Sequence, residues 1–298
     1  MRWFVVAALL ALSGAATVPG ASASTKPRLP PNLIVLVVAG QSNALGYQSF
    51  VIDPKTHKDV FTDKGASPAD RRVLFTFRDS GVSGGALPPG WLDTPQKRTG
   101  AASPVFGPEI GLARYLYNAG RKNLLVVKVA ISGSSLAVDW APHGEDLSLL
   151  VSRVQAALAW ATNHNLRPTI GGFYWVQGER DATDRAYAAD YRTNLVHFIA
   201  NVRHDLLLKS WTPFAIAQTD IASYINFEQA HHQCSTKNCR SERLWNSEVM
   251  KAQSSVTGKH VFLAKTAKLP RFKDALHLTD AAELSLGTTF GELTRSHI

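Results

Sequence analysis

Four short segments carry residues that could together perform serine-based acyl chemistry. Ser42 follows a short apolar run, and His277 follows Asp274 at a spacing of three residues. A neutral imidazole can take the proton of a serine hydroxyl, and a nearby carboxylate can fix the imidazole's tautomer. Gly133 could present an unhindered backbone N–H, and Gln177 could donate its side-chain amide to a developing oxyanion. The four segments therefore supply a nucleophile, a base, its orienting partner and oxyanion donors, the roles that acyl transfer needs.

Each segment also has a plain structural alternative. Ser42 could cap a helix, Gly133 could close a turn, and residues 177–179 could form a polar turn ahead of a helix. His277 could be an ordinary surface residue. The combination favours chemistry, because all four segments directly follow predicted strands. The carboxyl ends of parallel strands meet at one edge of a sheet, where open α/β folds place their ligands.

Strand-like and helix-like segments alternate along the chain. Short runs rich in β-branched residues predict five buried strands, at residues 33–39, 124–131, 170–176, 213–217 and 260–264. Segments with helical apolar spacing lie at residues 109–118, 147–162, 186–207, 242–255 and 281–296. This alternation predicts an α/β fold in which helices cover both faces of a parallel sheet. We identify no internal repeat and no Pro/Ser-rich linker inside the mature chain, so a single domain over residues 24–298 is expected.

The first 23 residues have the pattern of a secretory signal peptide. Arg2 supplies a positive charge, residues 4–12 form an apolar core too short to span a bilayer, and residues 21–23 (Ala-Ser-Ala) resemble a cleavage site. No other uncharged apolar run reaches spanning length. We therefore expect a mature protein that is secreted, to the periplasm or the extracellular space, without a membrane anchor.

The chain is basic, with a formal net charge of +9 at pH 7. Its lysines and arginines are scattered and form no basic arm, so we expect no nucleic-acid partner. The charge is interpreted as a general surface property, with an anionic surface or an acidic polysaccharide as the alternative.

The two cysteines, Cys234 and Cys239, enclose a short polar loop. In an exported protein an even pair of this kind predicts a disulfide. His231 and His232 directly precede the pair and offer a zinc site as the alternative. A zinc site normally needs three or four ligands, and no convincing further set lies nearby, so we expect a disulfide and no metal.

Five blocks of the chain resemble the ordered motifs of SGNH hydrolases, in particular the branch of sialate O-acetylesterase domains and related carbohydrate (acetylxylan) esterases. The blocks are Gly40-Gln41-Ser42-Asn43, Phe106-Gly107-Pro108-Glu109, Gly133-Ser134-Ser135-Leu136, Gln177-Gly178-Glu179 and Asp274-x-x-His277. The resemblance runs from about Asn32 to Thr289. It implies a flavodoxin-like three-layer α/β/α fold with a central five-stranded parallel sheet, no metal or organic cofactor, and hydrolysis of acetyl esters on sugars.

Carried over to this sequence, the resemblance makes Ser42 the nucleophile, His277 the base and Asp274 its partner. The backbone N–H groups of Ser42 and Gly133, with the Gln177 side chain, would form the oxyanion hole. The supporting positions would be Gln41, Asn43 and Glu179.

Three positions depart from the family's usual pattern. Arg180 stands where a small serine is usual, Ala44 where methionine is frequent, and Ala275 where glycine often follows the aspartate. These departures leave the chemistry intact and bear on the shape of the acyl pocket. Arg180, Trp91 and Trp140 are candidate substrate-binding residues. The tryptophans could stack on a sugar ring, or could be ordinary core or loop-packing aromatics.

Two polar stretches, residues 47–91 and 223–241, are predicted to be long loops that shape the substrate site. The predicted function is a secreted serine esterase that removes O-acetyl groups from carbohydrate through an acetyl-enzyme intermediate. A lipid or aryl esterase on the same scaffold and a non-catalytic glycan-binding protein are the alternatives. Binding alone does not need a nucleophile and a base, which argues against the second. The sugar, the acetylated position and the oligomeric state stay open.

Overall fold

The structure is a computed structural model that describes residues 31–50, 67–79, 87–96 and 104–298. The predicted signal peptide, residues 1–23, lies outside the described residues. No helix in the described part of the chain combines the length and the apolar character needed to cross a membrane.

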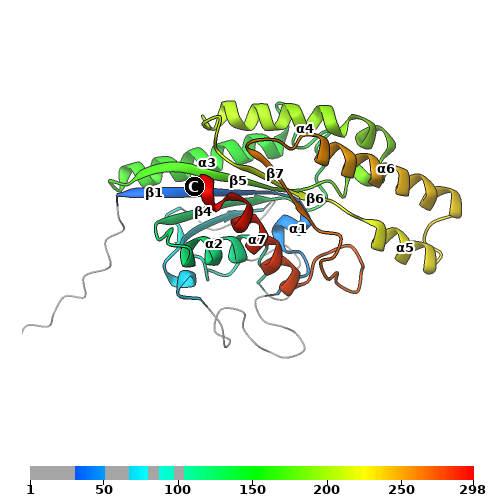
Figure 1. The fold of residues 1–298 in the computed structure, drawn as a ribbon, viewed down its shortest axis with the longest axis horizontal. Coiled ribbons are helices and arrows are strands. Elements are labelled where there is room, and N and C mark those ends of the chain that lie inside the picture. The colour runs from blue at the N-terminus through cyan, green and yellow to red at the C-terminus, as the bar shows by residue number, and fades with distance from the viewer. Residues whose placement is uncertain (1–30, 51–66, 80–86, 97–103) are drawn as a thin grey trace, which may run out of the picture.

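A mostly parallel sheet of seven strands forms the centre of the molecule (Figure 1). The strands are β1 (Asn32–Gly40), β2 (Leu74–Arg78), β3 (Gly90–Trp91), β4 (Leu124–Ala130), β5 (Arg167–Val176), β6 (Phe214–Gln218) and β7 (Val261–Lys265). Their order is β3-β2-β4-β1-β5-β6-β7, and among these strands β2 and β3 form the antiparallel pair. Strand β1 therefore lies between β4 and β5, at the point where the chain turns from one half of the sheet to the other.

The five predicted strands are confirmed as β1, β4, β5, β6 and β7. The prediction of a five-stranded sheet with a loop over residues 47–91 is wrong, because β2 and β3 lie within that stretch. Strand β2 exists because it pairs with β4 over its whole length and buries the rings of Phe75 and Phe77. The stability of such a strand depends on pairing with a distant part of the chain. The short segment itself, which has charged and polar flanks, therefore gives no clear strand signal in the sequence.

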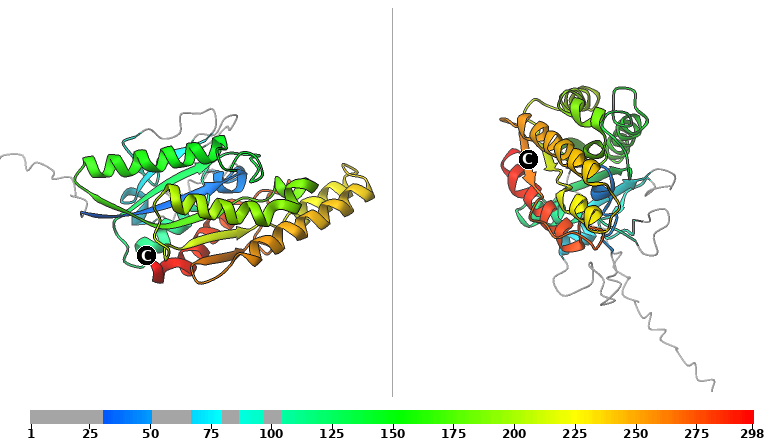
Figure 2. Two further views of the ribbon diagram at one scale, coloured as in Figure 1. Left: turned by 90° about the horizontal axis from the view of Figure 1, so that it is seen from above. Right: turned by 90° about the vertical axis from the view of Figure 1, so that its right-hand side faces the viewer.

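Helices cover both faces of the sheet (Figures 1 and 2). They are α1 (Ser42–Leu45), α2 (Glu109–Asn118), α3 (Glu145–Asn163), α4 (Arg185–Asp205), α5 (Ala222–Ala230), α6 (Thr236–Ser255) and α7 (Asp280–Thr294). Helices α3, α4 and α6 pack on one face, and α2 and α7 pack on the other. The three-layer α/β/α architecture is therefore as predicted.

Two separate hydrophobic cores result from the period of two in the strands. Val35 and Val37 of β1 point into the core beneath α3 and α4, whereas Leu36 and Val38 point into the core beneath α2 and α7. Successive side chains of a strand alternate between faces, so a strand buried on both sides must be apolar throughout. This is why the run before Ser42 contains no polar residue between Leu33 and Ala39.

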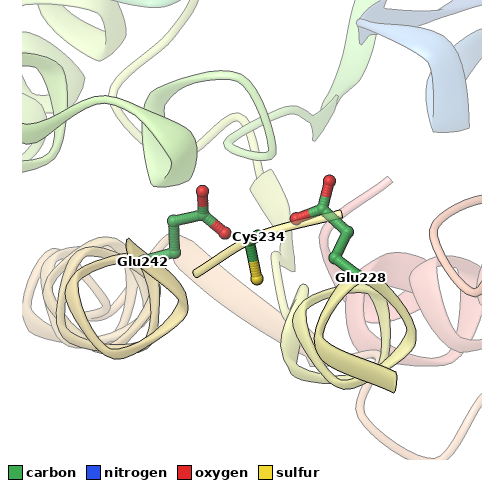
Figure 3. Close-up of side chains that lie close together, drawn as sticks. All are labelled: Glu228, Cys234 and Glu242. Carbon is green, nitrogen blue, oxygen red and sulfur yellow. The ribbon is translucent and has the colours of Figure 1, made fainter. Parts of the chain in front are cut away.

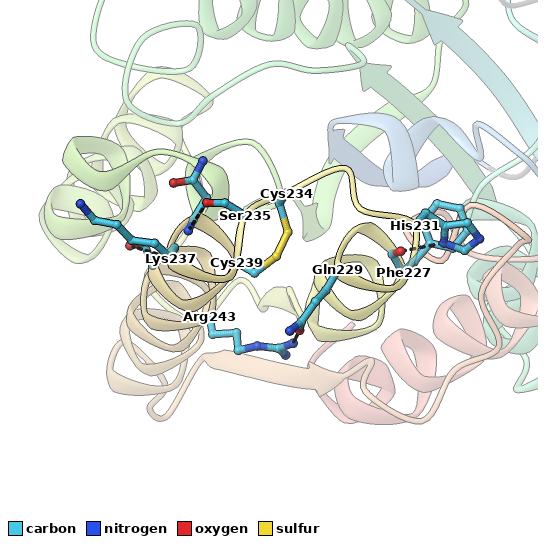
Figure 4. The surroundings of a disulfide bond; sticks show 10 residues. Phe227, Gln229, His231, Cys234, Ser235, Lys237, Cys239 and Arg243 are labelled. Atoms are coloured by element: carbon cyan, nitrogen blue, oxygen red, sulfur yellow. Dashed lines mark hydrogen bonds between the residues drawn. A yellow bond between two sulfur atoms is a disulfide. The ribbon is translucent and has the colours of Figure 1, made fainter.

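The predicted loop over residues 223–241 is mostly helical, since it contains α5 and the start of α6. The predicted disulfide between Cys234 and Cys239 is present and joins the linker between these helices to the first turns of α6 (Figure 4). The Arg243 guanidinium also donates a hydrogen bond of 2.8 Å to Gln229 Oε1 across the helix pair. Both sulfurs are held in the disulfide, which removes the thiolates that the alternative zinc site would require.

Candidate functional site

The turn that carries Ser42 is held in an unusual backbone conformation. Gly40 has a φ of +146°, and a Cβ atom there would lie 2.0 Å from the carbonyl oxygen of Val176. The Gln41 N–H donates to that same carbonyl at 3.0 Å. Gly46 ends the short helix α1 in a left-handed conformation, with its N–H bonded to the Ser42 carbonyl. Glycine is therefore required on both sides of Ser42, which begins α1 at the carboxyl end of β1.

A buried ion pair holds the C-terminal end of α1 against β4. The Lys128 ammonium of β4 lies 2.9 Å from Glu109 and donates a 3.0 Å hydrogen bond to the carbonyl of Leu45, the last residue of α1. Gly107 lies so close that a Cβ atom on it would approach the Ala44 carbonyl oxygen to 2.2 Å. The block around Gly107 and Glu109 therefore packs against α1, the helix that begins at Ser42.

The aspartate–histidine pair forms as predicted from its spacing. His277 Nδ1 lies 2.8 Å from Asp274 Oδ2, while Asp274 Oδ1 accepts the backbone N–H groups of Leu276 and His277, each at 3.0 Å. Burial is the largest influence on the Asp274 carboxyl and raises its pKa. The hydrogen bonds from the His277 ring and backbone together outweigh burial and lower the pKa to about 2. An ionised Asp274 accepts a proton-bearing Nδ1 and leaves Nε2 of His277 as the basic nitrogen.

Two further residues position the histidine. The ring of Tyr47 stacks on the His277 ring, with 4.6 Å between centroids and 26° between planes. Arg271 Nη1 donates to the Leu276 carbonyl at 3.2 Å, and its Nη2 donates to the Asp220 carbonyl at 3.3 Å. Arg271 thereby connects the turn at residues 274–277 to the segment that follows β6 through hydrogen bonds.

Ser42 and His277 line one pocket of about 380 Å³ at the carboxyl edge of the sheet. The other lining residues are Gln41, Tyr47, Ser132, Gly133, Glu179, Arg180, Thr183, Tyr224 and Leu276. Within the described chain, the backbone N–H groups of Ser42 and Gly133 have no acceptor. Gly133 has a φ of +76° with open space where a Cβ atom would stand, so its conformation rather than crowding favours glycine. The pocket thus combines a serine hydroxyl, a histidine and two unengaged N–H donors.

The prediction that the Gln177 side chain donates to an oxyanion is wrong. Gln177 is fully buried and does not line the pocket. Its Nε2 donates to the Ser134 carbonyl at 3.1 Å and to Asp181 Oδ2 at 2.5 Å, which uses both amide hydrogens. Its Oε1 accepts a 3.1 Å hydrogen bond from the Tyr191 hydroxyl. These partners come from separate elements, so the sequence around Gln177 could not reveal that the amide is engaged.

Gln177 instead positions the loop that carries Gly133, acting together with Asp181. The Asp181 carboxylate accepts the backbone N–H groups of Leu136 at 2.9 Å and Ala137 at 3.2 Å. Burial raises the pKa of Asp181 to about 6, although these hydrogen bonds oppose the rise. The loop after β4 is therefore held by a buried amide and a buried carboxyl beneath it.

Asn43 connects two of the turns that meet at the site. Its Nδ2 donates to Glu179 Oε1 at 2.6 Å, and its Oδ1 accepts the backbone N–H of Leu278 at 2.9 Å. Glu179 follows β5 and Leu278 precedes α7, so one side chain next to Ser42 links the turns on either side of it. This contact pattern is consistent with the supporting positions expected for Asn43 and Glu179.

The predicted sugar contact of Trp140 is wrong, because its ring is 0% exposed. Its Nε1 donates to Ser134 Oγ at 2.7 Å, and its edge meets the ring of Trp175. Trp91 is 40% exposed but lies in β3, at the outer edge of the sheet, and does not line the pocket. Of the three candidate substrate-binding residues, Arg180 lines the pocket, with an exposed side chain.

Two pocket tyrosines were not predicted from the sequence. Both lie at the start of the two stretches expected to shape the site: Tyr47 is the first residue of 47–91 and Tyr224 the second of 223–241. Their place in these stretches is the signal that could have identified them. Tyr224 comes from α5, where burial and the neighbouring Glu228 raise the pKa of its hydroxyl. The carboxylates of Glu228 and Glu242 point toward each other between α5 and α6 (Figure 3), and burial with the charge of Glu228 raises the pKa of Glu242.

Comparison with known proteins identifies the family. The chain matches the family described as "Carbohydrate esterase, sialic acid-specific acetylesterase" over residues 32–296. A probable carbohydrate esterase from Arabidopsis thaliana is 25% identical over 289 residues, 94% of this chain and 97% of that one.

Two solved structures share the fold of this chain. The structure of the Arabidopsis thaliana protein has a TM-score of 0.62 at 22% identity, covering 90% of this chain and 99% of that one. The structure of NanS has a TM-score of 0.61 at 16% identity and covers 90% of this chain and 98% of that one. The family match runs from β1 through α7 and so includes every residue of the pocket. The chain therefore belongs to the carbohydrate esterase family of sialic acid-specific acetylesterases.

Proposed function

We propose that this chain is an exported serine esterase that removes O-acetyl groups from carbohydrate. One observation carries the proposal: a single pocket is lined by Ser42, by His277 in its bond to Asp274, and by Gly133. Membership of the carbohydrate esterase family supports carbohydrate deacetylation as the reaction. The Arabidopsis thaliana relative is itself named a probable carbohydrate esterase.

In the first half of the reaction, the Ser42 hydroxyl attacks the carbonyl carbon of the acetyl ester. His277 Nε2 takes the hydroxyl proton, while Asp274 stabilises the imidazolium that forms. The negative charge that develops on the carbonyl oxygen is received by the unengaged N–H groups of Ser42 and Gly133. The C–O bond to the sugar then breaks, and the sugar alcohol leaves with the proton that His277 returns.

In the second half, water hydrolyses the acetyl group that is now esterified to Ser42. His277 takes a proton from the attacking water, and the same two N–H groups receive the second oxyanion. Collapse of this intermediate releases acetate and restores the Ser42 hydroxyl.

The pocket suits a small acyl group attached to a polar alcohol. Its volume of about 380 Å³ is at the small end of ligand sites, and its walls include Arg180, Thr183 and Ser132. We propose that Arg180 contacts the sugar, since a guanidinium offers several donors to hydroxyl or carboxylate groups. Tyr224 offers an aromatic surface of the kind that packs against a sugar ring.

Removal of the nucleophile tests the proposal. We expect Ser42→Ala to lower kcat for p-nitrophenyl acetate and for acetate release from acetylated sugars by about 10⁴-fold or more, without unfolding the protein. Ser148→Ala is the matched control, because Ser148 is exposed on α3 and does not line the pocket, and it should stay within a few-fold of wild type. Undiminished turnover by Ser42→Ala would contradict the mechanism.

The substrate class is tested by comparing esters. Acetate release from acetylated xylan, acetylated sialic acid and acetylated pectin or peptidoglycan fragments identifies the sugar. We expect p-nitrophenyl acetate to be hydrolysed with a higher kcat/KM than the octanoate, because the pocket is small. A preference for octanoate would favour the lipid esterase instead.

Export is tested by determining the N-terminal residue of the protein after signal-peptide cleavage. The pattern of residues 1–23 and the disulfide support secretion, since disulfides persist in oxidising compartments. We expect protein recovered outside the cytoplasm to begin at Ser24. Recovery of the intact chain from the cytoplasm alone would contradict this part of the proposal.

A further inference from the structure

The side chain of Gln41, next to the nucleophile, is anchored by only one end of its amide. Its Oε1 accepts the backbone N–H of Arg180 at 3.3 Å and that of Gly178 at 3.5 Å. Backbone N–H groups only donate, so the atom that faces them must be the oxygen. The orientation of the amide is thereby determined by chemistry, and its NH₂ group points away from the turn that follows β5.

The Gln41 NH₂ group has no acceptor within the described chain, although Gln41 is only 3% exposed. Some side-chain atoms of the described residues have no hydrogen-bond partner and are sealed from solvent, but Gln41 Nε2 is not one of them. The unpaired Nε2 is therefore accessible to solvent. The remaining opening is the pocket, which Gln41 lines together with Ser42 and Gly133. An unpaired amide donor in a nearly buried residue gains a hydrogen bond when an acceptor enters the pocket.

Gln41 and Gln177 follow neighbouring strands, yet their amides have opposite surroundings. The Gln177 amide is sealed in the core with both hydrogens engaged, as described above. The Gln41 amide keeps both hydrogens available at the pocket. Of these two side chains, Gln41 alone can act as a donor to a bound ligand.

We propose that the Gln41 side-chain amide is the third donor of the oxyanion hole, beside the backbone N–H groups of Ser42 and Gly133. The proposal rests on the esterase function proposed above. Gln41 directly precedes Ser42, so the rigid turn at Gly40 holds the amide at a constant position relative to the nucleophile. A donor held in place in this way costs little reorganisation when charge develops, and its hydrogen bond strengthens from the neutral carbonyl to the oxyanion.

Gln41→Glu separates this role from a structural one. The introduced carboxylate would keep an oxygen for the N–H groups of Gly178 and Arg180, but it would replace the NH₂ donor with a second oxygen that repels an oxyanion. We expect kcat for p-nitrophenyl acetate to fall by about 10²–10³-fold, with KM changed little and the melting temperature close to wild type. A purely structural role would leave kcat of this variant near the wild-type value.

A transition-state analogue supplies a second readout. Methylboronic acid forms a tetrahedral anionic adduct with an active serine, so its binding depends on the oxyanion donors. We expect its inhibition constant to rise in Gln41→Glu by about the factor by which kcat/KM falls. Gln41→Met, whose side chain has similar length but no N–H donor, should also lose boronate affinity in proportion to its loss of kcat/KM. It replaces Gln41→Glu as the test if that variant fails to fold.

The outcomes distinguish this inference from the proposed function. If Ser42→Ala is inactive while folded Gln41→Glu or Gln41→Met keeps kcat within about threefold of wild type, the role of Gln41 is overturned and the esterase stands. If Ser42→Ala remains active, the esterase mechanism itself fails. A loss of activity in the Gln41 variants without a matching loss of boronate affinity would also overturn the oxyanion role.

Discussion

Asp274 uses its two carboxylate oxygens for different purposes. Oδ1 accepts two backbone N–H groups and shapes the turn, whereas Oδ2 holds the ring of His277. The Gln48 amide also lies 3.4 Å from Oδ2. The carboxylate therefore both shapes the local backbone and favours the His277 tautomer with its proton on Nδ1.

We predict that Asp274→Asn lowers kcat for p-nitrophenyl acetate by about 10⁴-fold with little change in fold. An asparagine oxygen can still accept the backbone N–H groups, but the amide would favour the wrong His277 tautomer. Kinetics and circular dichroism of the purified variant provide the measurement. Gln48→Ala is the control and should stay within a few-fold of wild type; an Asp274→Asn enzyme with a tenth of normal kcat would rule out this role for the carboxylate.

The turn from Asp274 to His277 passes through a strained residue. Ala275 has a φ of +58°, in the left-handed region that favours glycine. The turn is nonetheless closed, because Asp274 caps it and the Ala275 N–H donates to the Phe272 carbonyl at 2.8 Å. The structure thus shows why glycine would suit this position, since glycine adopts positive φ without steric cost.

We predict that Ala275→Gly raises the free energy of unfolding by up to about 1 kcal/mol. Relief of the left-handed alanine gains roughly 1–2 kcal/mol, and the greater entropy of glycine in the unfolded chain removes part of that gain. Urea denaturation measures the change, and kcat should be unaltered. A marked destabilisation by this substitution would show that Ala275 does not adopt the left-handed conformation.

The helix pair α5–α6 brings Tyr224 to the pocket, since Tyr224 belongs to α5 and α6 packs against that helix. Arg243 of α6 donates a hydrogen bond to Gln229 of α5, Asn246 of α6 accepts the Ile221 N–H just before α5, and the disulfide ties the linker between the helices to α6. The pair projects past the carboxyl edge of the sheet (Figure 1). Its stability therefore bears directly on the shape of the substrate site.

We predict that replacing Cys234 and Cys239 with serine costs about 2 kcal/mol of stability, which is what chain entropy gives for a loop as short as this one. We also expect KM for an acetylated carbohydrate to rise a few-fold while kcat changes less, since Tyr224 lines the pocket without lying on the proton path. Differential scanning calorimetry and steady-state kinetics measure the two effects. Arg243→Ala, which removes an exposed contact between the same helices, should cost well under 1 kcal/mol.

Several buried acidic groups make the stability of the whole molecule depend on pH. Burial raises the pKa of Asp146 from 3.8 to about 7, with further contributions from the charges of Asp139 and Glu145. A raised folded-state pKa means that the folded protein binds more protons than the unfolded chain between about pH 4 and 7. The contribution of Asp146 is therefore fully present below its unfolded pKa and is lost as the pH rises through 7. Asp274, with a pKa of about 2, has the opposite sign and loses its contribution in strong acid.

We predict that Asp146→Asn stabilises the protein more at pH 8 than at pH 5, because it removes a buried charge that is present only at the higher pH. Thermal melts of wild type and variant at the two pH values measure the difference. Glu145→Gln is the control, since Glu145 is exposed in the same first turn of α3 and shares the helix-dipole effect. An equal shift of melting temperature at both pH values would show that Asp146 is not buried as described.

Much of the fold could be predicted from local patterns. The run 33–39 is apolar throughout and the other four predicted strands are predominantly apolar, and the predicted ends of α2, Glu109 and Asn118, are those observed. Strands β2 and β3 were missed because they depend on pairing with β4, and α5 because a polar, cysteine-bearing segment resembles a loop. The sequence predicts that Ser42, Gly133 and His277 come together, because each follows a strand and the strand ends of a parallel sheet share an edge, and the three line one pocket.

Strand periodicity, turn glycines and the Asp-x-x-His spacing are local properties, which is why the linear chain is enough to predict the α/β architecture and the meeting of Ser42, Gly133 and His277 at one pocket. The direction in which a side chain points is not local. Gln41 and Gln177 are chemically identical and both stand just beyond a strand, so nothing in their flanking residues separates an available donor from a sealed one. The distinction comes from hydrogen-bond partners that folding brings close. The Arg180 N–H, 139 positions away, bonds the oxygen of Gln41 and leaves its NH₂ group available, whereas Ser134 and Asp181 accept both amide hydrogens of Gln177.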